Sequence, residues 1–142
     1  MSFTFSKKER LCSKLLFDRL FETGKSVYEN PLKAIWIFTD EVQITPCLVA
    51  ISIPKKKIRK AFARNSLKRK IREAYRLNKD ILLPFLQSSN MQLACIILYN
   101  SSEIAGFNVI NDALKKILNK IVVKVGENND NQIVENSTLP LQ

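Results

Sequence analysis

Apolar residues recur with a helical period near the N-terminus, and this pattern predicts a first helix over residues 13–23. Ser13 is the candidate N-cap of this helix, and Gly24 is the candidate stop signal. The apolar residues fall in two rows spaced one turn apart, Leu16 with Leu20 and Phe17 with Phe21. Both rows belong to one broad apolar face, so we expect the helix to pack on a hydrophobic surface.

Three stretches follow the pattern of extended chain instead. Residues 32–39 are rich in β-forming side chains, and the acidic pair at 40–41 predicts a turn after them. Residues 42–53 form a second extended region, in which Pro46 is expected to split the strand or to mark an edge or a bend. The short apolar run at 91–100 is typical of a buried strand.

A second helical period covers the segment from about Lys60 to Asn78. The residues that share its apolar face are Ala63, Leu67, Ile71, Ala74 and Tyr75. We interpret Phe62 as a further core residue. Lys68, Arg69, Arg72 and Arg76 point away from this face, with Asn65 among them. The pattern therefore predicts a helix that is anchored on one side and cationic on the other.

The cleanest amphipathic stripe belongs to a third helix, for which Ser101 or Ser102 is the candidate cap. Its apolar residues are Phe107, Ile110, Leu114, Ile117, Leu118 and Ile121. From Gly126 on, the chain is polar and has no period, so residues 126–142 are expected to be a disordered tail. The order helix, two or three strands, basic helix, strand, helix predicts one α+β domain over residues 1–125, with helices on a small sheet.

Charge changes the picture, because residues 55–76 hold eleven Lys or Arg and one acid, Glu73, while the rest of the chain holds twelve of each sign. The whole net charge of +10 therefore lies in this segment. A basic helix is usually just a solvated surface without a partner, but a surface that serves solubility alone favours interspersed positive and negative side chains. Arg and Lys at this density suit the phosphates of nucleic acid. A helix that binds an anionic membrane surface needs an exposed apolar face. Here the apolar face of the helix is expected to pack in the core, so a membrane partner is disfavoured.

Composition gives little support to catalysis by the chain itself. It has no histidine, no glycine-rich phosphate loop and no apolar run near the roughly 20 residues that span a bilayer. The N-terminus lacks the apolar segment of a signal peptide.

Three well-separated cysteines, Cys12, Cys47 and Cys95, predict reduced core residues of a cytoplasmic protein. Because nearly the whole exposed helix face is cationic, recognition of RNA backbone and shape is favoured over base reading in DNA.

The stretch RNSLKRKIREAYR resembles the signature of the bacterial ribonuclease P protein subunit. In that family, four residue pairs recur at fixed spacing, and here they are Lys60–Ala61, Arg64–Asn65, Lys68–Arg69 and Arg72–Glu73. The segments FSKKERLCSKLLFDRLFETGKS and LVAISIPKKK are also similar to the family, and the likeness covers roughly residues 5–121. Two positions depart from the family pattern: Ser66 stands where a basic residue is common, and Arg59 stands where a glycine is common. Lys70 or Arg59 is a candidate to replace the contact that a basic residue at position 66 would make.

The resemblance implies a mixed sheet with three helices in the order α-β-β-β-α-β-α. It also implies that the basic helix lies in a left-handed β-α-β crossover, against the strong right-handed default. In that family the partner RNA performs catalysis, using bound Mg²⁺ to remove the 5′ leader of precursor tRNA by endonucleolytic hydrolysis. The protein contributes no catalytic residue and no tightly bound metal, and we expect no membrane and no obligate protein partner.

Two sites follow from the resemblance. The basic helix docks on the catalytic RNA through Lys60, Arg64, Asn65, Lys68, Arg69 and Arg72, with Arg76, Lys55, Lys56 and Lys57 in second rank. A cleft between the first helix and the sheet holds the single-stranded leader through Phe17, Phe21, Trp36, Lys14 and Lys33. Trp36 matches a family aromatic only if one residue is inserted after Gly24, and the Phe pair has core packing as its alternative. Glu73 is expected to pair with a helix neighbour such as Arg69 rather than with a metal.

Two other classes of protein remain as alternatives at this point. A ribosomal or chaperone-like RNA-binding protein would use the same basic helix but needs no leader cleft. A DNA-binding helix-turn-helix protein fits less well, because strands are predicted and no short turn precedes the basic helix.

Overall fold

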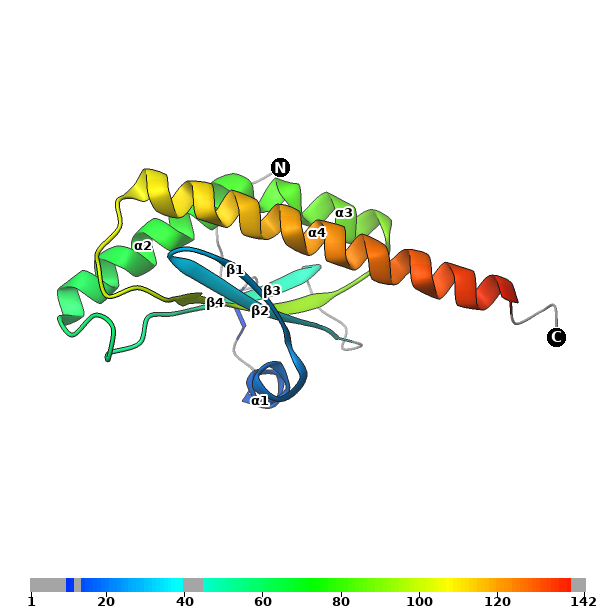
Figure 1. The fold of residues 1–142 in the computed structure, drawn as a ribbon, viewed down its shortest axis with the longest axis horizontal. Helices are drawn as coiled ribbons and strands as arrows, with labels where there is room; N and C mark the ends of the chain where they lie inside the picture. Colours follow the sequence, from blue (N-terminus) through cyan, green and yellow to red (C-terminus); the bar gives the residue numbers. More distant parts are fainter. Residues whose placement is uncertain (1–9, 12–13, 40–44, 139–142) are drawn as a thin grey trace.

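A four-stranded sheet with helices on both faces forms the molecule, as the computed structural model shows (Figure 1). The structure describes residues 10–11, 14–39 and 45–138, with side chains as far as residue 127. Its elements are α1 (Lys14–Thr23), β1 (Lys25–Glu29), β2 (Leu32–Phe38), β3 (Cys47–Ser52), α2 (Ala61–Asn78), the 3₁₀ turn η2 (Lys79–Ile81), α3 (Leu83–Ser88), β4 (Leu93–Tyr99) and α4 (Phe107–Thr138). The predicted order of three helices and four strands is confirmed, with η2 and α3 added between α2 and β4.

The strand order in the sheet is β1-β2-β4-β3. β2 pairs antiparallel with both β1 and β4, whereas β3 and β4 run parallel. The predicted mixed sheet is thereby confirmed. A parallel pair needs a crossover connection, and here the crossover contains α2, η2 and α3. Its left hand stays a prediction of the family resemblance.

The two faces of the sheet are covered very differently (Figure 1). α2, α3 and α4 lie over one face, and the large core beneath them includes Leu67 and Ile71 of α2 and Leu114 of α4, all 0% exposed. Of the helices that the structure describes, α1 lies under the opposite face. The smaller core on that side consists of Leu11, Leu16, Leu20, Ile37, Ala94 and Ile96, with Phe17, Ile35, Leu48, Ala50 and Leu98 packed against it.

α1 packs tightly against the sheet at its C-terminal end. A Cβ added at Gly24 would lie 2.3 Å from the Leu20 carbonyl oxygen and 2.4 Å from Cγ2 of Ile35. The Gly24 N–H donates to that same Leu20 carbonyl at 2.9 Å, which ends the helix where the sequence predicted. Ser13, the predicted N-cap, lies outside the described residues. Gly24 is thus required by close packing as well as by the end of the helix.

Both edges of the sheet make further contacts. On the β1 edge, the Lys120 ammonium of α4 donates to the Tyr28 carbonyl at 3.1 Å and to the Glu29 carboxylate at 2.8 Å. These contacts hold the pKa of Glu29 below its usual value, chiefly through the Lys120 hydrogen bond. On the β3 edge, Arg10 forms an isolated parallel bridge with Val49, and the Leu11 N–H donates to the Val49 carbonyl at 2.9 Å.

Several sequence predictions need correction or extension. The last helix begins at Phe107 rather than at Ser101 or Ser102, because Ser101 accepts the Glu103 N–H and caps a turn instead. The same helix runs on to Thr138, beyond the point where the apolar stripe ends. No proline interrupts residues 107–138, and a single internal glycine costs a helix only about 1 kcal/mol. The domain boundary at residue 125 stays a prediction.

The described cysteines are core residues, as predicted. Cys47 and Cys95 are buried in neighbouring strands. Burial raises the pKa of the Cys95 thiol to about 12, so this group stays protonated and unreactive. Cys12 lies outside the described residues.

Candidate nucleic-acid interface

α2 divides into a buried stripe and an exposed face, as its sequence period predicts. The stripe consists of Ala63, Leu67, Ile71, Ala74, Tyr75 and Asn78. Asn78 also ties the helix to α4, because its amide donates to the Ala74 carbonyl at 2.7 Å and to the Asn111 side chain at 2.6 Å. A helix anchored in this way holds the charges on its outer face in fixed positions.

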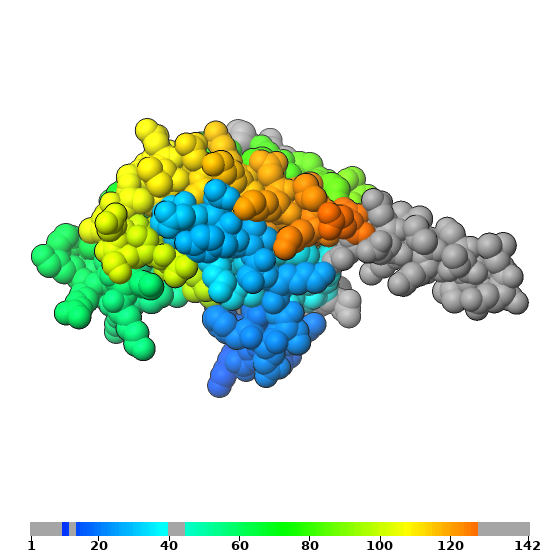
Figure 2. Space-filling model, viewed as in Figure 1, coloured from blue at the N-terminus to red at the C-terminus, as the bar shows by residue number. Residues whose placement is uncertain are grey.

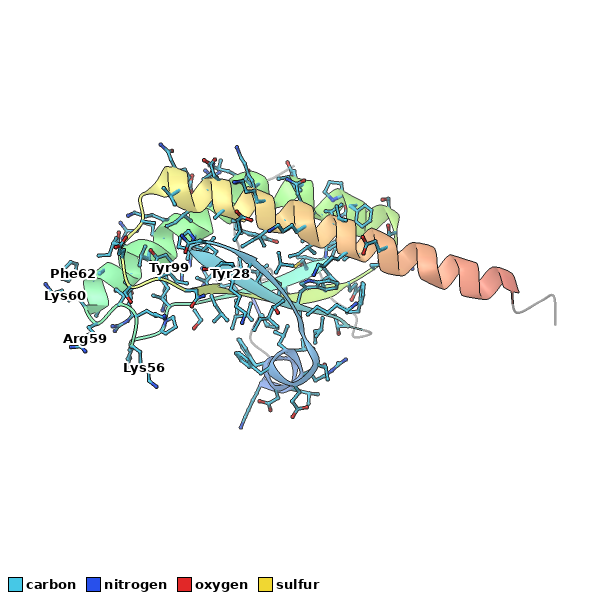
Figure 3. The ribbon with its side chains drawn as sticks, in the orientation of Figure 1. Tyr28, Lys56, Arg59, Lys60, Phe62 and Tyr99 are labelled. Carbon is cyan, nitrogen blue, oxygen red and sulfur yellow. The ribbon has the colours of Figure 1, made fainter. Side chains whose placement is uncertain are left out.

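Most residues predicted to dock RNA lie on the exposed surface: Lys55, Lys56, Lys57, Lys60, Asn65, Arg69 and Arg72. The side chains around the start of α2 protrude at one end of the molecule, where they are green at the left of Figure 2. Figure 3 shows Lys56, Arg59 and Lys60 at this end, directed away from the sheet. Lys60, at the N-cap, makes no side-chain cap hydrogen bond. Their role in binding RNA stays a prediction.

Two cations of the basic segment instead bind carbonyl groups of the protein. The half-buried Arg64 guanidinium turns back and donates to the Ile58 carbonyl at 3.0 Å and to the Arg59 carbonyl at 2.7 Å. Lys70 donates to the Ala105 carbonyl at 3.1 Å, linking α2 to the loop before α4. Arg64 therefore supports the turn that leads into α2. Of the two residues considered as compensation for Ser66, Arg59 is exposed and Lys70 has this internal partner.

Glu73 pairs with a helix neighbour, as predicted, but the neighbour is Arg76 rather than the example Arg69. Its carboxylate accepts hydrogen bonds from Arg76, one of them from Nε at 3.0 Å, rather than from Arg69. The Arg76 hydrogen bond holds the pKa of Glu73 below its usual value, and the same contact raises the pKa of Arg76. The spacing i,i+3 allows this pair as well as i,i+4. Because Arg76 is paired with Glu73, Arg69 is a stronger candidate than Arg76 to contact an RNA phosphate.

A hollow of about 250 Å³ lies between α1, β3 and α2. Its lining residues are Arg10, Leu11, Phe17, Val49, Ala50, Ile51, Lys68 and Arg72. Phe17 was predicted to contact the leader, and Lys68 and Arg72 were predicted to dock the catalytic RNA. The fold brings these three side chains to one site, which sequence spacing could not show because they lie on different helices.

Trp36 does not belong to this site, and its prediction as a leader contact is wrong. It is 0% exposed and lies in the large core beneath α2 and α4. Side chains alternate along a strand, so its neighbour Ile35 faces α1. The burial of Trp36 therefore contradicts its assignment to the leader.

The other predicted leader residues lie around α1. Phe21 is 61% exposed, Lys14 is exposed at the start of the helix, and Lys33 is half-buried on the face that α1 covers. Tyr28 was missed by the sequence reasoning. It pairs with Lys33 across β1 and β2, shares the same face and is 51% exposed. Residues 25–29 show little apolar alternation, so the sequence carried no strong signal for this residue.

A mixed α+β fold with a rigid cationic helix face defines a small protein whose surface suits a polyanion. A sequence model of the family described as Ribonuclease P matches residues 5–122. The chain is 32% identical over 124 residues to a ribonuclease P protein component of Porphyromonas gingivalis, covering 87% of this chain and 90% of that protein. The chain belongs to the family of bacterial ribonuclease P protein components, which are subunits of an RNA-based endoribonuclease.

Solved structures share the fold. The RNase P protein of Thermotoga maritima aligns with a TM-score of 0.63 at 23% identity, covering 79% of this chain and 96% of that one. The RNase P protein of Staphylococcus aureus aligns with a TM-score of 0.62 at 22% identity, covering 78% and 92%. The predicted family and fold class are therefore confirmed.

Among the described residues, no helix combines the length and hydropathy needed to cross a membrane. The same part of the chain contains no group of three or more His, Cys, Asp or Glu residues placed to hold a metal ion.

Proposed function

We propose that this chain docks on the catalytic RNA of ribonuclease P through the exposed face of α2 and holds the 5′ leader of precursor tRNA in the hollow beside Phe17. The observation that carries the proposal is the meeting of an aromatic side chain from α1 with two cations from α2 around that hollow. An aromatic ring stacks with any base, and flanking cations bind the backbone. This combination suits an enzyme that must accept many leader sequences.

α2 contributes both to docking on the catalytic RNA and to holding the leader, because some of its cations line the hollow and others do not. Lys68 and Arg72 line the hollow, so we assign them to the leader backbone as well as to docking. Arg69 and Asn65 are exposed and do not line the hollow, so they are assigned to the catalytic RNA alone. Cations that neutralise RNA phosphates release counterions and reduce repulsion between RNA segments. The protein should therefore lower the Mg²⁺ concentration that the holoenzyme requires.

The hydrolytic step belongs to the RNA in this proposal, with Mg²⁺ at the RNA active site. Mg²⁺ supplies charge stabilisation and an activated water there. The protein positions the two RNA molecules and takes no part in bond cleavage. We assign the protein to the cytoplasm as part of a tRNA-processing ribonucleoprotein, with the catalytic RNA and precursor tRNA as partners, and with no membrane and no obligate protein partner.

Reconstitution with a transcribed ribonuclease P RNA at low Mg²⁺ tests the main proposal. We expect the protein to stimulate cleavage of precursor tRNA, with stimulation that falls as salt rises. Lack of stimulation by a folded protein that still binds the RNA would contradict the proposal.

Substitutions at Phe17 test the assignment of the leader site. Phe17→Ala should reduce the preference for precursor over mature tRNA about 5- to 150-fold, the equivalent of one lost base stack. Phe17→Leu keeps most of the packing against the small core but removes the aromatic ring, so it should lose the same preference. Leu15→Ala is the matched control, because Leu15 is a 61% exposed apolar residue of the same helix. An unchanged preference in both Phe17 variants would place the leader elsewhere.

The alternative of a ribosomal or chaperone-like RNA-binding protein has no specific observation in its favour. The family match and the curated relative both carry the description of ribonuclease P.

A further inference from the structure

Phe62 is the most exposed large apolar side chain among the described residues, at 72%. The sequence interpretation of this residue as core is therefore wrong. Its position explains why: at about 100° per residue it lies roughly 100° beyond Ala63, which is itself at the edge of the apolar stripe, so the Phe62 side chain faces away from the core. No packing requirement of the core accounts for a phenylalanine at this position.

Phe62 lies on the cationic face of α2. Setting about 100° per residue, Phe62 and the exposed Arg69 differ by about 20° in direction, which places them in one line along the helix. Lys60 lies with its ammonium nitrogen 5.8 Å from the centre of the Phe62 ring. Figure 3 shows Phe62 together with Lys60 and Arg59 at the protruding end of the molecule. A water-exposed aromatic ring therefore lies beside positive charge.

The neighbouring surface is hollowed and also basic. A hollow of about 170 Å³ lies between the start of α2 and the loop before α4, and its lining includes Lys57, Arg59, Lys60 and the 57% exposed Ile104. The N–H groups of the first helical turn add partial positive charge here. A phosphate next to a stacked base would find several donors within this small area.

We propose that Phe62, with Lys60 and Arg59, forms a stacking site for one unpaired nucleotide of the RNA that α2 docks on. This inference rests on the proposed function and adds a contact through a base to a docking surface otherwise made of phosphate contacts. The ring takes the base, and the flanking cations take the adjoining phosphates. Charge complementarity favours a nucleotide over a protein partner, because residues 55–76 carry eleven cations and their one acid is bound by Arg76.

The site differs from the leader hollow in place and composition. The leader hollow lies between α1, β3 and α2, and its lining includes Phe17, Lys68 and Arg72 but not Phe62. The Phe62 site lies at the start of α2, beside the loop before α4. Loss of one site should therefore leave the other intact.

The test uses the full chain and the catalytic RNA without precursor tRNA, and it measures the dissociation constant over a range of salt concentrations. Phe62→Ala should weaken binding about 5- to 150-fold, as expected for one lost base stack, while the slope of affinity against salt stays unchanged because no charge is removed. Phe62→Trp should retain affinity, and Phe62→Leu should lose it. Leu77→Ala is the matched control, because Leu77 is an exposed apolar residue near the other end of α2.

Chemical probing of the RNA gives the second readout. One unpaired base should be protected by the wild-type protein and by Phe62→Trp, and should become reactive with Phe62→Ala. Equal affinity of wild type and Phe62→Ala, or full affinity of Phe62→Leu, would overturn the stacking site. A change in protein mass on Phe62→Ala in sedimentation without RNA would instead assign the ring to a second copy of the chain. If wild type itself fails to bind the RNA, the proposed function fails and not this site alone.

Discussion

The two faces of the sheet differ in how completely helices cover them, and the difference separates a closed core from accessible side chains. The face under α2 and α4 is closed, and its core includes side chains as large as Trp36 and Tyr75 with almost no exposure. The face over α1 has a smaller core, and part-exposed residues such as Phe17 and Lys33 lie on that side. Burial on the first face stabilises the fold, which allows the second face to keep aromatic and cationic groups accessible.

The largest effect is expected from a cavity in the closed face. Ile71 of α2 is 0% exposed, and Ile71→Ala should lower the free energy of unfolding by about 2–5 kcal/mol. Denaturant unfolding followed by circular dichroism measures this change. Leu15→Ala, at a 61% exposed position of α1, provides the baseline for an apolar side chain outside either core. If Ile71→Ala and Leu15→Ala lowered the free energy of unfolding by similar amounts, the contrast between the closed core and the exposed surface would be contradicted.

A smaller effect is expected where α1 meets the sheet. Gly24→Ala places a methyl group against the Leu20 carbonyl and the Ile35 side chain, so α1 or Ile35 must shift. Overpacking of this kind costs about 1–3 kcal/mol. Hydrogen exchange should show faster exchange in α1 while the amides of α2 and β4 keep their protection. The matched control is Gly106→Ala, because an added Cβ at Gly106 meets nothing within 4 Å. Uniform loss of protection would mean that the two faces unfold as one unit.

The smallest effect is expected from the Glu29 contacts with α4 on the closed side. The pKa of Glu29 is lowered in the folded state, so its contribution is present above the unfolded value of about 4.5 and is lost as pH falls through the folded pKa. Glu29→Gln should therefore lower the melting temperature slightly at pH 7, and the difference from wild type should shrink below pH 4.5. Asp18→Asn, an exposed change on α1, is the control. A difference that grows in acid would contradict this account.

The sequence predicted the parts of the fold that rest on strong periodicity. The stripe of α2 from Ala63 to Tyr75 and the apolar run of β4 are buried as their patterns indicate. The segment KSVYE of β1 was not recognised as a strand, because its residues show little apolar alternation. Without that hairpin the register of β2 is undefined, and a shift of one residue exchanges Trp36 with Ile35 between the two faces.

The candidate site was less predictable because contacts across elements decide it. Arg64 matches the family motif, yet its guanidinium binds two carbonyls of the preceding turn. Phe62 is exposed although the next residue, Ala63, is buried, because adjacent side chains on a helix point about 100° apart. Lys68 and Phe17 belong to different helices and meet around one hollow only after folding. Sequence spacing identified the chemical groups, and tertiary packing decided which of them act together.

The contacts at the two outer strands have a consequence for association. Unpaired strand edges are templates for pairing with another chain, and proteins avoid this by covering or charging them. Here Lys120 binds a main-chain carbonyl of β1, and the segment at Arg10 and Leu11 pairs with β3 at Val49. These contacts protect parts of both edges against sheet-to-sheet aggregation. Partly covered edges and a strongly charged helix together favour a dispersed protein over a self-associated one.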